Sequence, residues 1–213
     1  MKRVATLFAS ALALVTTNAA AQDSNAPVSA AAAPATTPAK APPKLIVTIS
    51  VDQFSADLFA EYRNHFTGGF KRLLDGAVFP SGYQSHAATE TCPGHSTILT
   101  GMRPTRSGII ANSWVDLKTA RTDKTVYCAE DESVPGSNSI VYTVSDKHLL
   151  VPALGERMKA ANPATRVGGV AGKDRAAVMM GGHQVDELWW WDGKKFVSYV
   201  GRTTPPIVQQ AND

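Results

Sequence analysis

The sequence predicts an α/β sandwich that carries a small β-hairpin insertion. Hydrophobic residues make up 44% of the 213-residue chain and charged residues 18%, which is the composition of a globular protein. Apolar, β-branched runs alternate along the chain with segments of helical periodicity. Residues 188–199 are typical of two short strands joined by Asp192-Gly193, a two-residue hairpin turn. Strands that alternate with helices favour a mostly parallel sheet, to which the hairpin is added.

The N-terminal region predicts export. Lys2 and Arg3 precede the uncharged apolar run 4–15, and alanines at 19–21 offer a cleavage site before Gln22. Residues 1–21 are therefore expected to be a signal peptide. A membrane anchor is the alternative, but the apolar run is shorter than the ~20 residues that span a bilayer. The mature protein is expected to be periplasmic or secreted, with no membrane attachment after cleavage.

The next segment predicts a linker. Residues 22–43 are rich in Ala, Pro, Ser and Thr and show no periodicity. The folded part is expected to span residues 44–213. The formal net charge is only +3, and no run of basic residues occurs, so no nucleic-acid partner is expected.

The first half of the folded part is predicted to begin with a strand and a helix. Residues 45–51 have the pattern of a strand buried in a parallel sheet. Ser55 is a candidate N-cap for the helix, which Gly68-Gly69 are expected to end. A shorter helix over 70–74 and a strand over 77–79 follow. The apolar face of the first helix comprises Leu58, Phe59, Tyr62 and Phe66.

The second half is predicted to alternate in the same way. A helix over 93–100 has Pro93 in its first turn and Gly101 just after its end. A buried strand over 167–170 precedes a loop at its carboxyl end. Two further helices are expected, over 152–161, with Leu154 and Met158 facing inward, and over 174–180.

Asp52 is a candidate metal ligand, since it directly follows the run 45–51. Ligands of open α/β sheets bind beyond the carboxyl ends of the strands, where a carboxylate is well placed to hold a metal ion. The alternative is an aspartate that only caps the helix near Ser55.

Thr91 is a candidate nucleophile because it precedes a helix whose free N–H groups and dipole favour an anion such as phosphate. A threonine hydroxyl is a weak nucleophile and needs a base or a metal ion to react. The alternative is that Thr91 is an N-cap and His95 an ordinary polar residue of the first turn. Thr89, two residues earlier, is the competing hydroxyl.

Three further residues could contact an oxyanion. Asn112 could donate its side-chain amide to a phosphoryl oxygen, or it could be an ordinary turn residue. Lys173 and Arg175 lie two residues apart beyond the second long strand, so both could point at one oxyanion. The alternative is that both are ordinary solvated residues at the start of a helix.

Taken together, these residues resemble the alkaline phosphatase superfamily, in particular its bacterial secreted branch of the Sphingomonas type. That branch has a threonine nucleophile and a Lys-x-Arg phosphate clamp. The resemblance runs from Lys44 to the end of the chain and implies a sandwich with a central, mostly parallel sheet and helices on both faces. The segments that carry it are 51–53, 68–74, 91–96, 100–101, 108–114, 126–131 and 173–175.

The resemblance also implies roles for the candidate residues. Asp52 is similar to a metal-ligating aspartate, and Thr91 to a nucleophile that is transiently phosphorylated and also touches a metal. Asn112 is similar to the amide that binds a phosphoryl oxygen, and Lys173 with Arg175 to the basic clamp. The implied reaction is hydrolysis of small phosphate monoesters at alkaline pH, assisted by two Zn ions, in a monomeric enzyme. A structural Ca ion is left open.

The sequence departs from the family in its metal ligands. The remaining ligands are expected in an Asp-x-x-x-His motif, an Asp-His pair and a distant histidine, and after Arg175 the only histidine is His183. The chain is therefore expected to be an N-terminal piece of an enzyme more than twice as long, inactive by itself.

Other functions stay open. A phosphodiesterase of the superfamily is disfavoured by the clamp, and a sulfatase by the lack of a Cys/Ser-x-Pro-x-Arg motif. A truncated, non-catalytic protein that binds phosphate or a partner is the third alternative.

Two cysteines, Cys92 and Cys128, occur in a chain expected to reach an oxidising compartment. A disulfide between them is favoured, and two buried free thiols are the alternative. A bond would fix the loop that presents Thr91.

Overall fold

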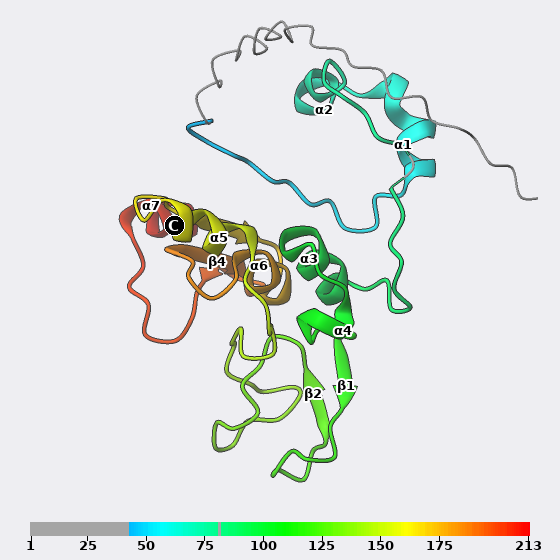
Figure 1. Ribbon diagram of the computed structural model, residues 1–213. Coiled ribbons are helices and arrows are strands. Elements are labelled where there is room, and N and C mark those ends of the chain that lie inside the picture. Colours follow the sequence, from blue (N-terminus) through cyan, green and yellow to red (C-terminus); the bar gives the residue numbers. More distant parts are fainter. Residues whose placement is uncertain (1–42, 81) are drawn as a thin grey trace, which may run out of the picture. The chain divides into compact units, whose positions relative to one another are not determined.

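The computed structural model describes residues 43–80 and 82–213 (Figure 1). The predicted signal peptide, its cleavage before Gln22 and nearly all of the predicted linker lie outside the described residues. All helices and strands named below belong to the unit Thr48–Asp213. Within the described part, no helix is long and apolar enough to cross a membrane.

Helices and short strands alternate along this unit, as expected for a mixed α/β chain. The helices are α1 (Ala56–Tyr62), the 3₁₀ helix η1 (Arg63–His65), α2 (Gly68–Leu73), α3 (Thr91–Thr100), α4 (Pro104–Ser107), α5 (Leu154–Ala161), α6 (Asp174–Gly181) and α7 (Pro206–Asn212). The strands are β1 (Ser113–Val115), β2 (Thr125–Tyr127), β3 (Gly168–Ala171), β4 (Glu187–Trp191) and β5 (Phe196–Val197).

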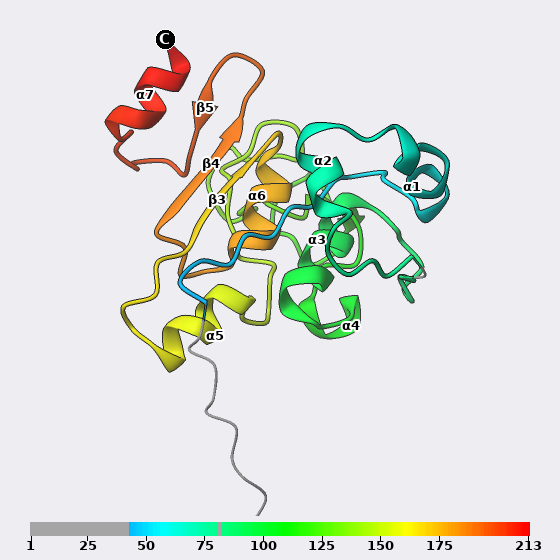
Figure 2. The same ribbon diagram turned by 90° about the horizontal axis from the view of Figure 1, so that it is seen from above.

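The strands form two small sheets. In the larger sheet, β4 is central, with β3 parallel to it on one side and β5 antiparallel on the other (Figure 2). Helix α6 connects β3 to β4 and packs against both, and α7 packs against β5. The second sheet is the antiparallel pair β1–β2, which the sequence analysis did not predict.

The predicted hairpin near the C-terminal end is present, but its turn is longer than predicted. Trp191 pairs with Phe196, so residues 192–195 lie outside the ladder. The side chain of Asp192 accepts the N–H groups of Lys194 and Lys195 at 2.8 and 2.9 Å. These hydrogen bonds stabilise a four-residue turn in which Asp192 is the first residue. The predicted turn contained only Asp192 and Gly193.

The buried core joins α3, α6, β2 and β4. Helices α3 and α6 pack against each other. Their buried side chains form one cluster with residues of the strands and of the loops between them. Fully buried members are Cys92, Ile109, Cys128, Ala129, Val178, Met179 and Leu188. Because this core holds the first turns of α3 and α6 together, the loops that precede them meet at one place.

Two predicted strands near the start of the unit are absent. Residues 45–51 and 77–79 have no strand assignment, and Val47 and Phe79 are 67% and 87% exposed. The prediction was wrong for the described structure because a strand needs a neighbour to pair its N–H and C=O groups. Within the described residues, no strand pairs with either segment.

Helix α1 begins as predicted, and the Ser55 hydroxyl accepts the N–H of Leu58 at 3.2 Å. The predicted end of this helix at Gly68-Gly69 is wrong, because α1 ends at Tyr62 and a new helix, α2, begins at Gly68. Between the helices, Phe66 adopts an extended backbone that breaks the helical path. The rings of Phe54, Phe59, Phe66 and Phe70 contact one another across this break.

Two burial predictions are corrected. Leu154 is 41% exposed and Met158 only half-buried, whereas Glu156 is the buried residue of α5. Glu156 is buried because its carboxylate accepts the N–H of Ala153 and contacts His183. In β3, Val170 is 70% exposed, so this strand is not buried on both faces.

Candidate active site

One cleft of about 320 Å³ contains all five candidate residues of the sequence analysis. They come from the loop before α1, the start of α3, the loop before β1 and the start of α6. The cleft is lined by Asp52, Gln53, Thr89, Glu90, Thr91, Asn112, Lys173 and Arg175. Two carboxylates, two hydroxyls, two amides and two cationic groups therefore surround one space.

Thr91 and Asp52 face each other in this cleft. The Thr91 hydroxyl donates a hydrogen bond to Asp52 Oδ2 at 2.9 Å. Helix α3 starts two residues earlier than predicted, so Thr91 is its first residue and Glu90 occupies the N-cap position. The alternative of Thr91 as an N-cap is therefore wrong. The cap of α1 is supplied by Ser55, so the capping alternative for Asp52 is wrong as well.

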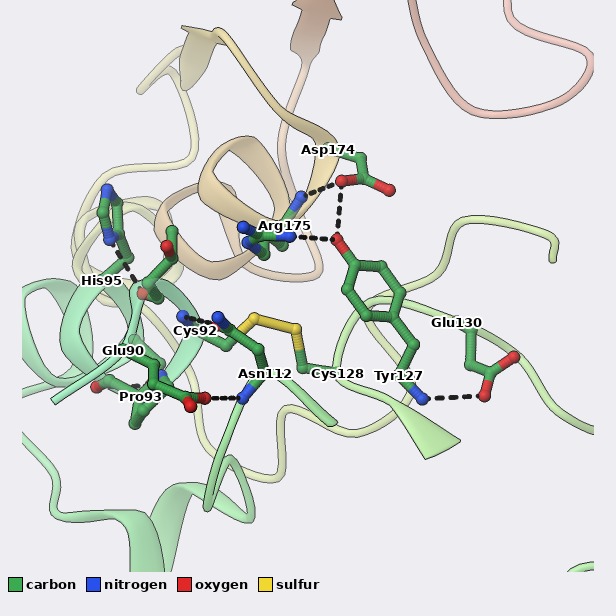
Figure 3. Close-up of a disulfide and its surroundings, with 12 residues drawn as sticks. Glu90, Cys92, Pro93, His95, Asn112, Tyr127, Cys128, Glu130, Asp174 and Arg175 are labelled. Atoms are coloured by element: carbon green, nitrogen blue, oxygen red, sulfur yellow. Dashed lines mark hydrogen bonds between the residues drawn. A yellow bond between two sulfur atoms is a disulfide. The ribbon is translucent and has the colours of Figure 1, made fainter. Parts of the chain in front are cut away.

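Asn112 is held by three hydrogen bonds, two of which Figure 3 shows, and its side-chain NH₂ has no hydrogen-bond partner among the described residues. Its side-chain oxygen accepts the N–H of Cys92 at 2.8 Å, and its main-chain N–H donates to Glu90 Oε2 at 2.5 Å. Its carbonyl accepts the N–H of Cys128 at 2.9 Å. With the oxygen already bonded, the side-chain NH₂ is the group that can donate to a ligand.

The start of α3 offers fewer N–H donors than the sequence suggested. The N–H of Cys92 is bonded to Asn112, and Pro93 has none. The N–H of Gly94 bonds to the carbonyl of Glu90. An anion near Thr91 would still gain from the helix dipole. Its hydrogen bonds would come mainly from the side chains around it.

The basic pair lies at the start of α6, beyond the carboxyl end of β3. Lys173 occupies the N-cap position and is exposed. Arg175 is half-buried, and its Nη1 donates to the Tyr127 hydroxyl at 3.4 Å. Burial alone would lower the pKa of Arg175, but the hydroxyl of Tyr127 and the charge of Asp174 outweigh it and raise the pKa. Arg175 is therefore cationic and is not simply a solvated residue of the first turn.

Asp174, between the two basic residues, belongs to a buried polar network that sequence reasoning missed. Its carboxylate accepts the hydroxyls of Tyr127 and Tyr142, each at 2.8 Å, and the N–H of Arg175 at 2.7 Å. Burial and the charge of Asp174 raise the pKa of Tyr127 to about 12 and raise that of Tyr142 further. Both tyrosines are thus neutral donors at any pH at which the protein would work.

A disulfide joins Cys92 to Cys128, with a Cα–Cα separation of 6.5 Å, which confirms the favoured prediction.

Glu90 and Gln53 also line the cleft, and the sequence analysis did not assign a role to either of them. Glu90 has no motif of its own; only its position next to Thr91 hinted at a role. Gln53 adopts the left-handed conformation with φ of 61°, which is uncommon for a residue with a side chain and turns the chain directly after Asp52.

The cleft brings together two oxygen donors that could contribute to a metal site. The Asp52 carboxylate is a donor of the type that Zn binds, and the Thr91 oxygen lies 2.9 Å from it. A Zn site takes three or four protein ligands. Over residues 43–80 and 82–213, no group of three or more His, Cys, Asp or Glu side chains is placed to hold a metal ion. The two donors fit a metal ion, and further ligands are needed to complete its site.

Known proteins share both this fold and much of this sequence. The model of the family described as type I phosphodiesterase / nucleotide pyrophosphatase matches residues 46–210. The chain belongs to this family, within the alkaline phosphatase superfamily. It is 68% identical to alkaline phosphatase PhoK of Sphingomonas sp over 176 residues, which cover 82% of this chain and 32% of PhoK. It is 58% identical to alkaline phosphatase PhoD of Zymomonas mobilis over 72% of this chain and 26% of PhoD.

Solved structures agree on the fold. The crystal structure of alkaline phosphatase PafA superposes with a TM-score of 0.65 at 31% identity, over 76% of this chain and 32% of that one. A second structure, with TM-score 0.65 and 29% identity, is a PafA variant in which a threonine, an asparagine, a lysine and an arginine are replaced. This chain therefore has the mixed α/β fold of that enzyme and spans about a third of its length.

Proposed function

We propose that this chain carries the nucleophile and the phosphate-binding half of an alkaline phosphatase that hydrolyses phosphate monoesters. The observation that carries the proposal is the single cleft in which Thr91, Asp52, Asn112, Lys173 and Arg175 meet. The names of the relatives support it, as does the PafA variant, whose four replaced residue types are those of this cleft. In that variant the threonine and asparagine stand 21 residues apart, as Thr91 and Asn112 do.

In this proposal Thr91 attacks the phosphorus atom. Its oxygen, held by Asp52, forms the new P–O bond while the bond from phosphorus to the leaving oxygen of the substrate breaks on the opposite side. The hydroxyl proton is released, and the leaving oxygen takes up a proton from solvent to become an alcohol. The free amide of Asn112 and the cationic Lys173 and Arg175 bind the non-bridging oxygens and stabilise the charge on them. Water then releases inorganic phosphate from the phosphothreonine.

Asp52 and Thr91 would also be ligands of a divalent metal ion, which we propose to be one of two Zn ions. A bound Zn ion would lower the pKa of the threonine hydroxyl and neutralise charge on the leaving oxygen. Asp52 and Thr91 cannot complete either site by themselves, so the remaining ligands would come from residues other than those of this cleft. The protein is proposed to act outside the cytoplasm, since residues 1–21 have the pattern of a signal peptide.

A chimera tests this proposal. Residues 44–213 would replace the matching region of the Sphingomonas alkaline phosphatase PhoK, which is 68% identical. We expect the purified chimera to release p-nitrophenol from p-nitrophenyl phosphate, to lose activity with a chelator, and to regain it with Zn. A folded chimera that binds Zn but does not hydrolyse the monoester would contradict the proposal and favour a binding protein.

A phosphodiesterase is the second candidate, since the matched family is named for that activity. The same chimera distinguishes the two, because a diesterase would hydrolyse bis-p-nitrophenyl phosphate faster than the monoester.

A further inference from the structure

Two neighbouring residues, Tyr127 and Cys128, bond to residues at the starts of two different helices, α6 and α3 (Figure 3). The Tyr127 hydroxyl lies between Asp174 and Arg175, at the start of α6. Cys128 forms the disulfide with Cys92, directly after Thr91 at the start of α3. The two helices that present the proposed nucleophile and the proposed clamp are thus connected through one peptide unit.

This peptide unit is firmly anchored in the core. Tyr127 is 7% exposed and Cys128 fully buried. The N–H of Tyr127 donates to Glu130 Oε1 at 2.8 Å, and Glu130 is itself fully buried and paired with Arg121. Because this segment is buried and its main chain is hydrogen-bonded, the two side chains that it carries start from fixed positions.

Each of the two residues fixes different groups in or beside the cleft. The N–H of Cys128 holds the carbonyl of Asn112, while its sulfur holds Cys92. The hydroxyl of Tyr127 donates to Asp174 and accepts from Arg175, so it restrains the guanidinium at a single point. The Arg175 Nε is buried and has no hydrogen-bond partner among the described residues, so Tyr127 is the contact that orients this side chain.

We propose that Tyr127–Cys128 is a brace that sets the position of Arg175 relative to Thr91 and Asn112, with Tyr127 as a positioning residue. The consequence for the ligand rests on the proposed function, because a phosphoryl group would have to reach all three residues at once. Arginine binds oxyanions with fixed planar geometry, so a guanidinium that rotates freely would lose this match. The brace itself exists without a ligand and can be tested without one.

The first test observes Arg175 in the ligand-free, ¹⁵N-labelled chain by NMR, through its Nε–Hε signal and the rotation of its guanidinium. Tyr127→Phe removes one oxygen atom from a buried ring. We expect it to shift the Arg175 signal and to accelerate guanidinium rotation at least about threefold, because a hydrogen bond to Nη1 is lost. Tyr83→Phe is the matched control, since Tyr83 is 90% exposed and should leave the signal unchanged.

The second test needs no substitution. Reduction of the only disulfide with dithiothreitol should also shift the Arg175 signal, although neither cysteine hydrogen-bonds to Arg175. Backbone amide signals of α6 and β4 report whether the fold persists in each sample. An Arg175 signal that is the same in folded wild-type, Tyr127→Phe and reduced protein would overturn the brace.

Titration with inorganic phosphate separates this inference from the proposed function. We expect phosphate to shift the side-chain signals of Asn112 and Arg175, with an affinity at least about threefold weaker in Tyr127→Phe. If phosphate moves no cleft signal but Tyr127→Phe still frees Arg175, the brace stands and the proposed phosphate site fails. If phosphate binds equally to both proteins, Tyr127 does not position Arg175 for the ligand and the inference is wrong.

Discussion

The hydroxyl of Thr91 donates to the carboxylate of Asp52 across 2.9 Å, although 39 residues separate them in the chain. Thr91 is the first residue of α3, and Asp52 lies in the loop before α1. Their meeting places a hydroxyl and a carboxylate at the same end of one cleft. The hydroxyl is therefore held in a fixed direction before any ligand arrives, which a nucleophile requires.

Replacement of Thr91 is the sharpest test of the proposed chemistry. In the chimera with PhoK, Thr91→Ala should abolish formation of the phosphoenzyme and reduce turnover by roughly 10³-fold or more, because the attacking atom is lost. Thr89→Ala is the matched control, since Thr89 lines the same cleft. Rapid acid quench with a ³²P-labelled monoester measures the intermediate. A labelled Thr91→Ala protein would show that another residue is the nucleophile.

The disulfide should stabilise the chain substantially. Cys92 and Cys128 are 36 residues apart, and closing a loop of that size stabilises the folded state by roughly 4 kcal/mol in the chain-entropy model. The double variant Cys92→Ala/Cys128→Ala should therefore lower the free energy of unfolding by about 3–4 kcal/mol. Urea unfolding followed by circular dichroism measures this difference.

Reductant provides a control for the disulfide measurement, because the chain has no other cysteine. Dithiothreitol should destabilise the wild-type protein and leave the double variant unaffected. Equal stability of the oxidised wild-type protein and the double variant would contradict the prediction.

His183 should make stability depend on pH. One ring nitrogen lies 3.1 Å from Glu156 Oε1 and the other 2.7 Å from the carbonyl of Leu149, so both face acceptors. Burial alone would lower the pKa of His183, but these two hydrogen bonds outweigh it and raise the pKa. A raised folded-state pKa stabilises the protein fully below the ordinary value of about 6.5, and this contribution is lost as the pH rises above it.

His183→Gln isolates this contribution, since glutamine does not titrate. The wild-type protein should exceed the variant in unfolding free energy by more at pH 5.5 than at pH 9. Urea unfolding at a series of pH values measures the difference, and a difference that is the same at both pH values would contradict the assignment.

The sequence predicted the residues that carry local signals and missed those that depend on distant contacts. Thr91, Lys173 and Arg175 could be chosen as candidates because each stands at a helix start, where residue type and position together suggest anion binding. Tyr127 was not singled out, because its partner Asp174 lies 47 residues away and no periodicity connects them. A buried tyrosine is typical of an ordinary core, so only the structure reveals its hydrogen bonds.

The same distinction explains the fold. The start of helix α1 was predicted correctly because its cap is supplied by an adjacent residue, Ser55, whereas its end at Tyr62 carries no such local signal. The strands over 45–51 and 77–79 were predicted from composition alone, whereas a strand also needs a pairing partner. Strand β4 has partners on both sides, and it was predicted nearly to its boundaries.

The 213-residue chain by itself should show no measurable phosphatase activity. Asp52 and Thr91 are two donors, and a catalytic Zn ion takes three protein ligands. Isothermal titration with Zn should accordingly show no tight binding at the cleft. The titration curves of the wild-type chain and of Asp52→Ala should therefore be the same. Metal-dependent hydrolysis of p-nitrophenyl phosphate by the purified chain, lost in Thr91→Ala, would show that the described residues suffice.

The basic pair should determine the preference for monoesters over diesters. A monoester dianion has one more charged oxygen than a diester, and Lys173 and Arg175 are the cations that line the cleft. In the chimera, Lys173→Ala or Arg175→Ala should reduce kcat/KM for p-nitrophenyl phosphate by about 10–100-fold, as expected for a lost charge-assisted hydrogen bond. The loss of kcat/KM for bis-p-nitrophenyl phosphate should be smaller by about tenfold, because a diester has less negative charge on the oxygens that Lys173 and Arg175 would bind.

Lys124→Ala is a suitable control, since Lys124 bonds to the carbonyl of Thr119 and does not line the cleft. Equal losses for both substrates would mean that the pair binds a group common to them, and the preference for monoesters would then have to come from another part of the enzyme.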